Sequence, residues 1–218
     1  MSKFGFIGTG NMGGALARAI VRAVGSENVI LSDKNITAVQ LLADELKCSY
    51  SDTITLAKTA KFIFLGVKPQ VLPNVLNSIS VCLAERSDRF VLVTMAAGVE
   101  IDKIKSILNN EYPIIRIMPN TPVSKGKGII QYCANSAVFM DELGEFCNSL
   151  RFAGRVDSLD ERLIDAASAV SGCGPAFAYL FAEALADAGV ECGLPRNKAI
   201  EYASQMLSGA AELLLTTG

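Results

Sequence analysis

The sequence contains no histidine, which removes the most common general acid–base and the most common transition-metal ligand at once. It also lacks any dense block of lysine and arginine, and its formal net charge is −2, which argues against nucleic acid as the main partner. The six cysteines are scattered and form no C-x-x-C motif, so we expect reduced thiols rather than disulfides. The missing ligand spacings predict that the chain has no metal site.

Long apolar runs without charge are scarce as well. A strand-like segment begins at residue 3, so we expect no signal peptide. The most apolar helical run, near residues 176–186, is short and contains Glu183, so it is not expected to span a bilayer. These features predict a soluble, cytoplasmic protein that does not enter membranes.

The first two-thirds of the chain alternate strand-like and helix-like segments. The expected strands are apolar runs that end in small or turn-forming residues, and the first expected helix covers residues 11–24. Such alternation predicts βαβ units and therefore an α/β Rossmann-type fold with a doubly wound parallel sheet over residues 1–156. The strands are expected at residues 4–7, 29–32, 62–67, 90–94 and 114–118, with a further one at 128–133.

The pattern becomes helical near residue 156. Ser158 and Glu161 have the spacing of a capping box, and helices are expected over residues 160–170, 175–188 and 197–215. The middle helix is apolar on nearly every side, and three helices in about sixty residues cannot easily cover it. We therefore predict that residues 157–218 form an all-α dimerisation domain that packs against a second subunit.

A glycine-rich loop follows the first strand and opens the first helix. Its pattern is Gly8-x-Gly10-x-x-Gly13, with Thr9, Asn11 and Met12 between the glycines. In such loops the first glycine permits a tight turn, the second lets the backbone approach a pyrophosphate, and the third allows close helix–strand packing. In this context the loop predicts a dinucleotide cofactor.

The end of the second strand bears on which dinucleotide binds. Asp33 follows Gly13 at the distance where an acid takes the ribose 2′-hydroxyl of NAD, whereas Lys34 could pair with the 2′-phosphate of NADP. The segment with Ser32 therefore leaves NADH and NADPH both open, and a plain polar turn explains each residue equally well.

Later strand ends carry further candidates, because α/β sheets bind ligands at the carboxyl ends of their strands. Val67, Lys68 and Pro69 end one strand, and Ala97 and Gly98 follow the next. Asn120 lies between two prolines after a third. Lys68 is more plausible as a cleft residue than as a catalytic cation, and the prolines are also compatible with a merely rigid loop.

The segment Ser171-Gly172-Cys173-Gly174-Pro175 precedes the apolar helix. Proline suits the first helical position, and backbone amides around it can hold an anion such as a carboxylate. A simple bend between core helices is the alternative. Glu183 and Asp187 lie four residues apart on the helix that follows, where a solvated stripe or a helix-end contact is favoured over acid–base chemistry.

Together these residues resemble pyrroline-5-carboxylate reductases over almost the whole chain. Each segment alone is weak evidence for the family, but all of them in this order are highly specific for it. The segments that carry the resemblance are Phe6–Gly13, Val67–Gln70, Ala96–Val99, Arg116–Pro122, Asp165–Ala166, Ser171–Ala176, Glu183–Val190 and Gly193–Arg196.

The resemblance implies reduction of 1-pyrroline-5-carboxylate to L-proline with NADPH or NADH, in a homodimer or larger homo-oligomer. On the cofactor side it places Gly8–Gly13, Ser32–Asn35, Val67–Pro69 and Ala97–Gly98, and on the substrate side Asn120 and Ser171–Pro175. No catalytic side chain is assigned, because we expect the reaction to depend on positioning of the reactants rather than on a side-chain acid. Cys173 stands where the family often has serine, and family members continue beyond residue 218 into a Ser-Pro-Gly-Gly-Thr-Thr loop.

Three alternatives stay open from the sequence. One is reduction of another cyclic imine, such as a six-membered ring. Another is a dehydrogenase of the 6-phosphogluconate or hydroxyisobutyrate type, although Arg162 and Lys198 fit its catalytic lysine poorly. The third is a nucleotide-binding dimer without activity.

Overall fold

The computed structural model describes residues 3–217. Contacts within the chain divide it into two units, Met1–Gly172 and Cys173–Gly218. The division falls later than the expected boundary after residue 156. The reason is that β8 (Gly154–Ser158) pairs with the sheet and that Ile164, the first residue of α7 (Ile164–Ser171), is buried in the core of the first unit.

The first unit is built on a sheet of eight strands among its described residues, in the order β3-β2-β1-β4-β5-β6-β7-β8. The neighbours from β3 to β6 are parallel, as the sequence predicted, but β6 and β7 are antiparallel. Only the short 3₁₀ helix Thr121–Lys125 connects them, and a parallel pair needs a much longer crossover. The first seven strands are β1 (Phe4–Ile7), β2 (Val29–Ser32), β3 (Ser49–Tyr50), β4 (Phe62–Leu65), β5 (Val91–Thr94), β6 (Ile114–Pro119) and β7 (Gly128–Ala134).

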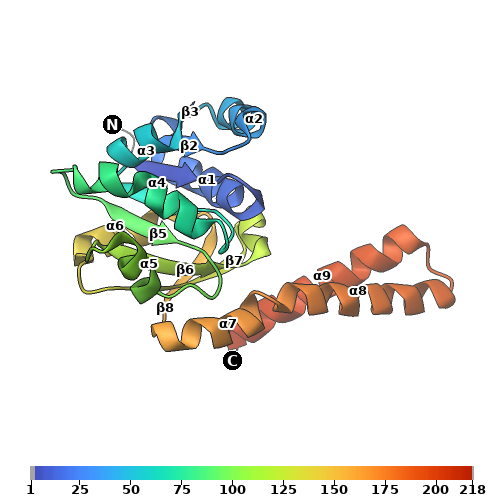
Figure 1. Cartoon of the computed structure of the whole chain (residues 1–218). Coiled ribbons are helices and arrows are strands. Elements are labelled where there is room, and N and C mark those ends of the chain that lie inside the picture. The colour runs from blue at the N-terminus through green and yellow to red at the C-terminus, as the bar shows by residue number, and fades with distance from the viewer. Residues whose placement is uncertain (1–2, 218) are drawn as a thin grey trace. The chain divides into compact units, whose positions relative to one another are not determined.

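Helices cover both faces of this sheet (Figure 1). Strands β1, β2, β4, β5 and β6 are buried along their whole length, which explains their continuous apolar sequences. The core on one face contains residues of α1, α2 and α6, and the core on the other contains residues of α3, α4 and α5. Their bounds are α1 (Asn11–Val24), α2 (Ile36–Leu46), α3 (Thr53–Thr59), α4 (Leu72–Ala84), α5 (Ile101–Leu108) and α6 (Met140–Ser149).

The predicted capping box at Ser158–Glu161 is wrong. The carboxylate of Asp160, not the hydroxyl of Ser158, accepts a hydrogen bond from the Arg162 amide at 3.0 Å. Glu161 instead accepts a hydrogen bond from the amide of Ile101 at 2.8 Å, at the first turn of α5. The Glu161 side chain, which the local pattern assigned to the cap, therefore binds a residue sixty positions away in the sequence.

The second unit is a pair of long helices, α8 (Gly174–Glu191) and α9 (Arg196–Thr217), which lie side by side (Figure 1). Small residues bring them together: Ala182, Ala186, Ala199 and Ala203 are buried between them. Large apolar side chains stay exposed, which leaves this unit without cover for much of its surface. They include Phe177, Tyr179, Leu180, Phe181, Tyr202, Leu213, Leu214 and Leu215. By length and composition alone, the helical stretch Glu161–Glu191 could also cross a membrane.

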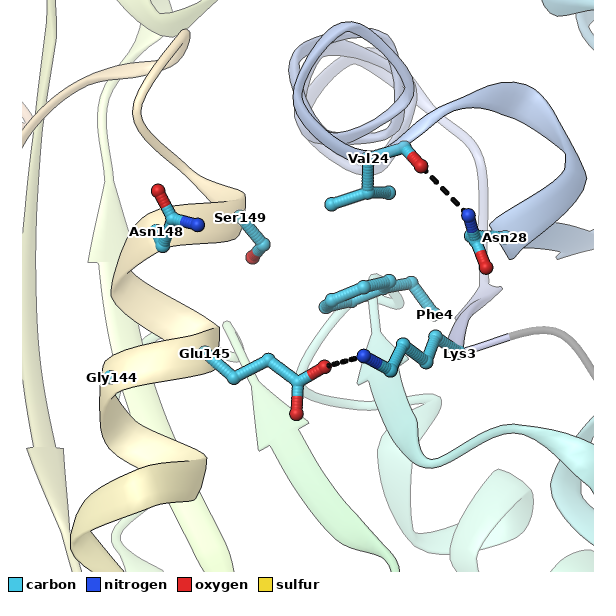
Figure 2. Close-up of a pocket in the computed structure, with 8 residues that line it drawn as sticks. All are labelled: Lys3, Phe4, Val24, Asn28, Gly144, Glu145, Asn148 and Ser149. Carbon is cyan, nitrogen blue, oxygen red and sulfur yellow. Dashed lines mark hydrogen bonds and ion pairs between the residues drawn. The ribbon is translucent and has the colours of Figure 1, made fainter.

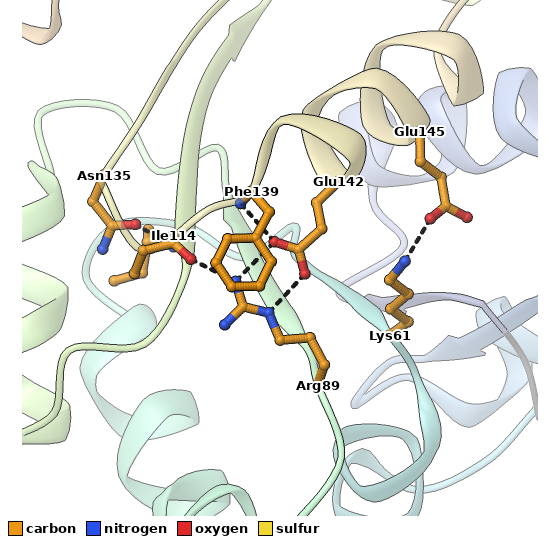
Figure 3. A network of polar contacts seen from close by, with 8 residues as sticks. Lys61, Arg89, Ile114, Asn135, Phe139, Glu142 and Glu145 are labelled. Carbon is orange, nitrogen blue, oxygen red and sulfur yellow. Dashed lines mark hydrogen bonds and ion pairs between the residues drawn. The ribbon is translucent and has the colours of Figure 1, made fainter.

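Ion pairs attach α6 to the end of the sheet where the strands begin (Figure 3). The carboxylate of Glu142 accepts two hydrogen bonds from Arg89, at 2.8 and 2.9 Å, and one from the Phe139 amide at 2.8 Å. One turn later, Glu145 pairs with Lys61 at 2.6 Å. Burial opposes ionisation of Glu142, but the hydrogen bonds from Arg89 and Phe139 outweigh it and hold the pKa of Glu142 below its ordinary value.

We expect Glu142→Gln to lower the free energy of unfolding by about 1–3 kcal/mol at neutral pH, because a buried charge-assisted pair is lost. Since the pKa of Glu142 is lowered in the folded state, its contribution is complete above the ordinary glutamate pKa. That contribution disappears as the pH falls through the folded-state pKa. Urea unfolding of both proteins at neutral and acidic pH should therefore show a difference that shrinks in acid.

The exposed neighbour Asp141, which makes no hydrogen bond with the residues described, provides the control as Asp141→Asn. This variant should unfold like the wild type within about 0.5 kcal/mol. A difference between Glu142→Gln and wild type that stays constant with pH would contradict the assignment.

Candidate functional site

Four of the predicted cofactor segments lie at one edge of the sheet. Gly8–Gly13, Ser32–Asn35, Val67–Pro69 and Ala97–Gly98 follow β1, β2, β4 and β5, and these strands are parallel. Strands β2 and β3 lie on one side of β1, and the chain then crosses to β4 on the other side, so β1 and β4 flank the point where the strand order reverses. Open α/β sheets bind ligands at such a point.

Three glycines approach one another there more closely than side chains would allow. A Cβ atom added to Gly13 would lie 2.2 Å from the carbonyl oxygen of Gly8, and one added to Gly66 would lie 2.4 Å from the same atom. Gly8 itself has a φ of +95°, which only glycine adopts readily. The glycine pattern thus holds the start of α1 against the ends of β1 and β4.

This packing leaves an open cradle at the start of α1. A Cβ on Gly10 would meet nothing within 4 Å, so space remains beside the backbone. Among the residues that the structure describes, the amides of Gly10, Asn11 and Met12 have no hydrogen-bond acceptor. Unpaired amides and the positive end of the helix dipole favour an anion here, so the loop fits the pyrophosphate of a dinucleotide.

Asp33 is tied to this loop. Its carboxylate accepts hydrogen bonds from the amide of Thr9 at 2.7 Å, from the Thr9 hydroxyl at 3.2 Å and from the amide of Asn35 at 3.0 Å. Ser32 is buried, and its hydroxyl lies 3.0 Å from the Thr53 hydroxyl. Lys34 is exposed and makes no ion pair with any described residue. Asp33 therefore fixes the glycine loop, while Lys34 remains available to a ligand.

The next two segments form turns. The carbonyl of Lys68 accepts hydrogen bonds from the amides of Val71 and Leu72, so this residue starts the turn into α4 while its side chain is exposed. Gly98 has a φ of +69°, and the turn closes with a 3.3 Å hydrogen bond from Val99 to Ala96. Val67, Pro69 and Ala97 complete these turns at the same edge of the sheet.

Asn120 and Ser171, both predicted to face substrate, are joined directly. The Asn120 side-chain amide donates to the carbonyl oxygen of Ser171 at 2.9 Å, and its oxygen accepts from the amide of Ile129 at 3.0 Å. A third residue, which the pattern did not indicate, joins them: the side-chain nitrogen of Gln131 donates to the Ser171 hydroxyl at 2.9 Å. The end of α7 is thus attached to both β6 and β7.

Arg116 is a second buried polar residue whose structural role the pattern did not indicate. Its side chain is 1% exposed and pairs with Asp165 at 2.7 Å and Glu161 at 3.3 Å, which attaches the start of α7 to β6. Opposite Arg116 on β7, burial raises the pKa of the Cys133 thiol to about 11, with Glu161 adding to the effect. That thiol stays protonated and is no nucleophile.

The segment from Ser171 to Pro175 is helical rather than an open loop. Gly172 and Cys173 both have right-handed helical backbone angles, and the Gly172 amide donates to the carbonyl of Ser168 at 2.8 Å. The amides of Cys173 and Gly174 have no acceptor among the described residues, and Pro175 has no N–H. Two unpaired amides at the start of α8 therefore remain for an anion.

The two carboxylates of α8 have a structural partner. Arg196, at the start of α9, pairs with Asp187 and lies 3.8 Å from Glu183. The pairing with α9 explains their spacing without acid–base chemistry, as the sequence favoured.

A cavity of ≈ 520 Å³ lies at the opposite end of the sheet, where Lys3 and Phe4 begin β1 (Figure 2). Lys3 reaches across it to Glu145 at 2.6 Å, and Asn28 donates to the carbonyl of Val24. Its polar side chains already have partners within the protein, so the cavity offers a ligand few of them. No group of three or more potential metal ligands occurs within residues 3–217.

Comparisons with known proteins agree with this geometry. A family model described as pyrroline-5-carboxylate reductase dimerisation matches residues 161–218, and one described as NADP oxidoreductase, coenzyme F420-dependent, matches residues 3–98. The pyrroline-5-carboxylate reductase of Escherichia coli is 33% identical over 99% of the chain and 80% of its own length. The chain belongs to the pyrroline-5-carboxylate reductase family.

Solved structures of pyrroline-5-carboxylate reductases extend the likeness to the fold. The enzyme of Plasmodium falciparum, solved with NADP bound, is 33% identical and has a TM-score of 0.84 over 99% of this chain and 79% of its own. That of Coxiella burnetii is 27% identical with a TM-score of 0.90, over 99% and 80%. The predicted Rossmann-type unit and helical unit are confirmed. Membership of the pyrroline-5-carboxylate reductase family also excludes the 6-phosphogluconate or hydroxyisobutyrate type of dehydrogenase.

We expect Asp33→Ala to weaken binding of NADPH and NADH equally, by about tenfold, because the Thr9 amide loses a charged acceptor and the loop loosens. Fluorescence titration of each nucleotide measures this. Lys34→Ala, which removes no side-chain hydrogen bond or ion pair with residues 3–217, should leave NADH affinity unchanged. If Asp33 were instead a ribose ligand, Asp33→Ala would weaken NADH alone and favour NADPH.

Proposed function

We propose that this protein reduces 1-pyrroline-5-carboxylate to L-proline, the last step of proline biosynthesis, with NADPH or NADH as hydride donor. The observation that supports this most is the presence of two sets of unpaired backbone amides, Gly10–Met12 and Cys173–Gly174, in a chain of this family. One set suits a pyrophosphate and the other a carboxylate.

The cofactor would be held at the glycine loop, with Gly8 and Gly13 shaping the turn and Thr9 fixed by Asp33. The reduced nicotinamide supplies a hydride for the carbon of the C=N bond. Val67, Lys68, Pro69, Ala97 and Gly98 would line the same edge of the sheet. Exposed Lys34 offers a cation to a 2′-phosphate, so we assign a preference for NADPH.

The substrate carboxylate would be held by the amides at the start of α8, with Ser171 and Asn120 fixing the chain that leads to them. A protonated imine is already an electrophile, so orientation alone can supply about 7–11 kcal/mol of barrier lowering. Such a reaction needs no histidine, which agrees with the composition.

We further propose that the protein is a homodimer formed through its helical unit. The exposed apolar side chains of α8 and α9 need cover, and the family model that matches them describes dimerisation. A cytoplasmic location, without nucleic acid or membrane as a partner, belongs to the same proposal.

The function is tested by following oxidation of NADPH with 1-pyrroline-5-carboxylate and with its six-membered analogue. We expect turnover with the five-membered imine and a weaker response to the larger ring. Gly174→Ala should raise the KM for the imine without lowering the melting temperature, because a Cβ there meets nothing among the described residues but lies beside an unpaired amide.

Gly144→Ala on α6, where an added Cβ also meets nothing and which lies outside the proposed dimer surface, is the matched control and should leave KM unchanged. Absence of NADPH oxidation by the folded wild-type protein would refute the proposed function. An unchanged KM in Gly174→Ala would refute the place assigned to the carboxylate.

Sedimentation velocity tests the dimer. Replacing Leu180, 63% exposed on α8, by glutamate should shift the protein to a monomer, because the charge would be buried in the interface. Ile36→Glu changes a similarly exposed apolar residue on α2 and should leave the dimer intact. A wild-type monomer at micromolar concentration, or a dimer in Leu180→Glu, would count against this surface.

A further inference from the structure

The turn between β5 and α5 is held only loosely by its own hydrogen bonds. The Ala96 amide lies 3.4 Å from the Thr94 hydroxyl, and the Val99 amide lies 3.3 Å from the carbonyl oxygen of Ala96. Most N–H···O bonds in proteins are shorter, at about 2.7–3.2 Å. At the tip of the turn Ala97 and Gly98 are exposed, and a Cβ added to Gly98 would meet no described atom within 4 Å. The shape of the turn therefore depends on how its two ends are held.

Glu161 holds the end of the turn that enters α5. Glu100, the residue before α5, makes no side-chain bond to the start of the helix among the described residues. Glu161 supplies the acceptor instead, because its Oε1 atom accepts a hydrogen bond from the Ile101 amide at 2.8 Å. The helix packs on the sheet through the buried side chains of Ile101, Ile104 and Leu108. The bond from Ile101 to Glu161 is thus not needed to dock α5, and it acts on the junction of turn and helix.

The Glu161 carboxylate is fixed in turn by a buried charge. Arg116 in β6 is 1% exposed, and its Nη1 atom donates to the same Oε1 atom at 3.3 Å. Arg116 is also the register partner of Thr94, the last residue of β5. Both ends of the turn are therefore tied to one place in the sheet. Asp165 already supplies a counter-charge to Arg116 at 2.7 Å, so Glu161 is not required to neutralise it.

The turn lies on the half of the sheet that would take the nicotinamide. A doubly wound sheet is built from two halves that each bind one nucleotide, and the segment after β2 recognises the ribose of the adenosine. That segment is Ser32–Asn35 in this chain. Strand β5 belongs to the other half, beyond the point where the strand order reverses.

We infer that Glu161 is a positioning residue for the nicotinamide half of the cofactor: by capping α5, it fixes the Ala96–Val99 turn against which that half would bind. This inference rests on the proposed function. A binding surface made of backbone is effective only when a supporting shell holds its geometry within a narrow range. Glu161 touches neither cofactor nor substrate in this role.

Three variants separate the cap from its surroundings. Glu161→Ala removes the acceptor. Glu161→Gln can place its one oxygen where Oε1 lies and keep the bonds from Ile101 and Arg116, since the Oε2 atom that it replaces has no hydrogen-bond partner within residues 3–217. Asp165→Ala is the control, because it removes the closer partner of Arg116 and leaves the cap in place.

Hydrogen exchange of the protein without nucleotide, resolved by residue, is the first readout. We expect several-fold faster exchange at the Ile101 amide in Glu161→Ala, because the amide loses its acceptor. Glu161→Gln and Asp165→Ala should keep the wild-type rate at this amide. An unchanged rate in Glu161→Ala, or a failure of Glu161→Gln to restore it, would overturn the inference.

Fluorescence titration with two nucleotides is the second readout. Glu161→Ala should bind NADPH several-fold more weakly, but it should bind adenosine 2′,5′-bisphosphate, which lacks the nicotinamide, as the wild type does. Glu161→Gln and Asp165→Ala should bind both as the wild type does. Unchanged NADPH affinity in Glu161→Ala, or equal weakening of both nucleotides, would reduce Glu161 to a structural residue. A wild-type chain that binds NADPH without turnover would refute the proposed function instead.

Discussion

The close approach of three backbone segments at Gly8, Gly13 and Gly66 is the constraint on which the rest of the first unit depends. Side chains at Gly13 or Gly66 would collide with the carbonyl oxygen of Gly8, so no other residue permits this packing. It brings the start of α1 to the point where the strand order reverses. At Gly10, by contrast, an added Cβ would meet nothing within 4 Å, so the backbone there stays accessible.

Both proposed binding sites use the same physical device. Each is the start of a long helix whose first amides have no acceptor among residues 3–217. Asp33 fixes the glycine loop, and Asn120 with Gln131 fixes the residue at the end of α7. Backbone amides need no titratable side chain, which explains how a chain without histidine can bind two anionic groups.

The sequence predicted what depends on local pattern and could not predict what depends on distant partners. The helix over residues 11–24 and the strands at the buried apolar runs agree with the structure, because periodicity and glycine spacing determine them. The antiparallel β7, the use of Glu161 by α5 and the bond from Gln131 to Ser171 arise from tertiary contacts. Asp33 had the spacing of a ribose ligand, and its hydrogen bonds with Thr9 and Asn35 are a further role that spacing alone could not show.

The central claim is that two separate sets of backbone amides bind the two reactants. Nuclear magnetic resonance of the ¹⁵N-labelled protein tests it most directly, by titration first with NADPH and then with the product L-proline. The account predicts that NADPH shifts the amide signals of Gly10, Asn11 and Met12, and that L-proline shifts those of Cys173 and Gly174. L-proline binding that leaves Cys173 and Gly174 unshifted would contradict it.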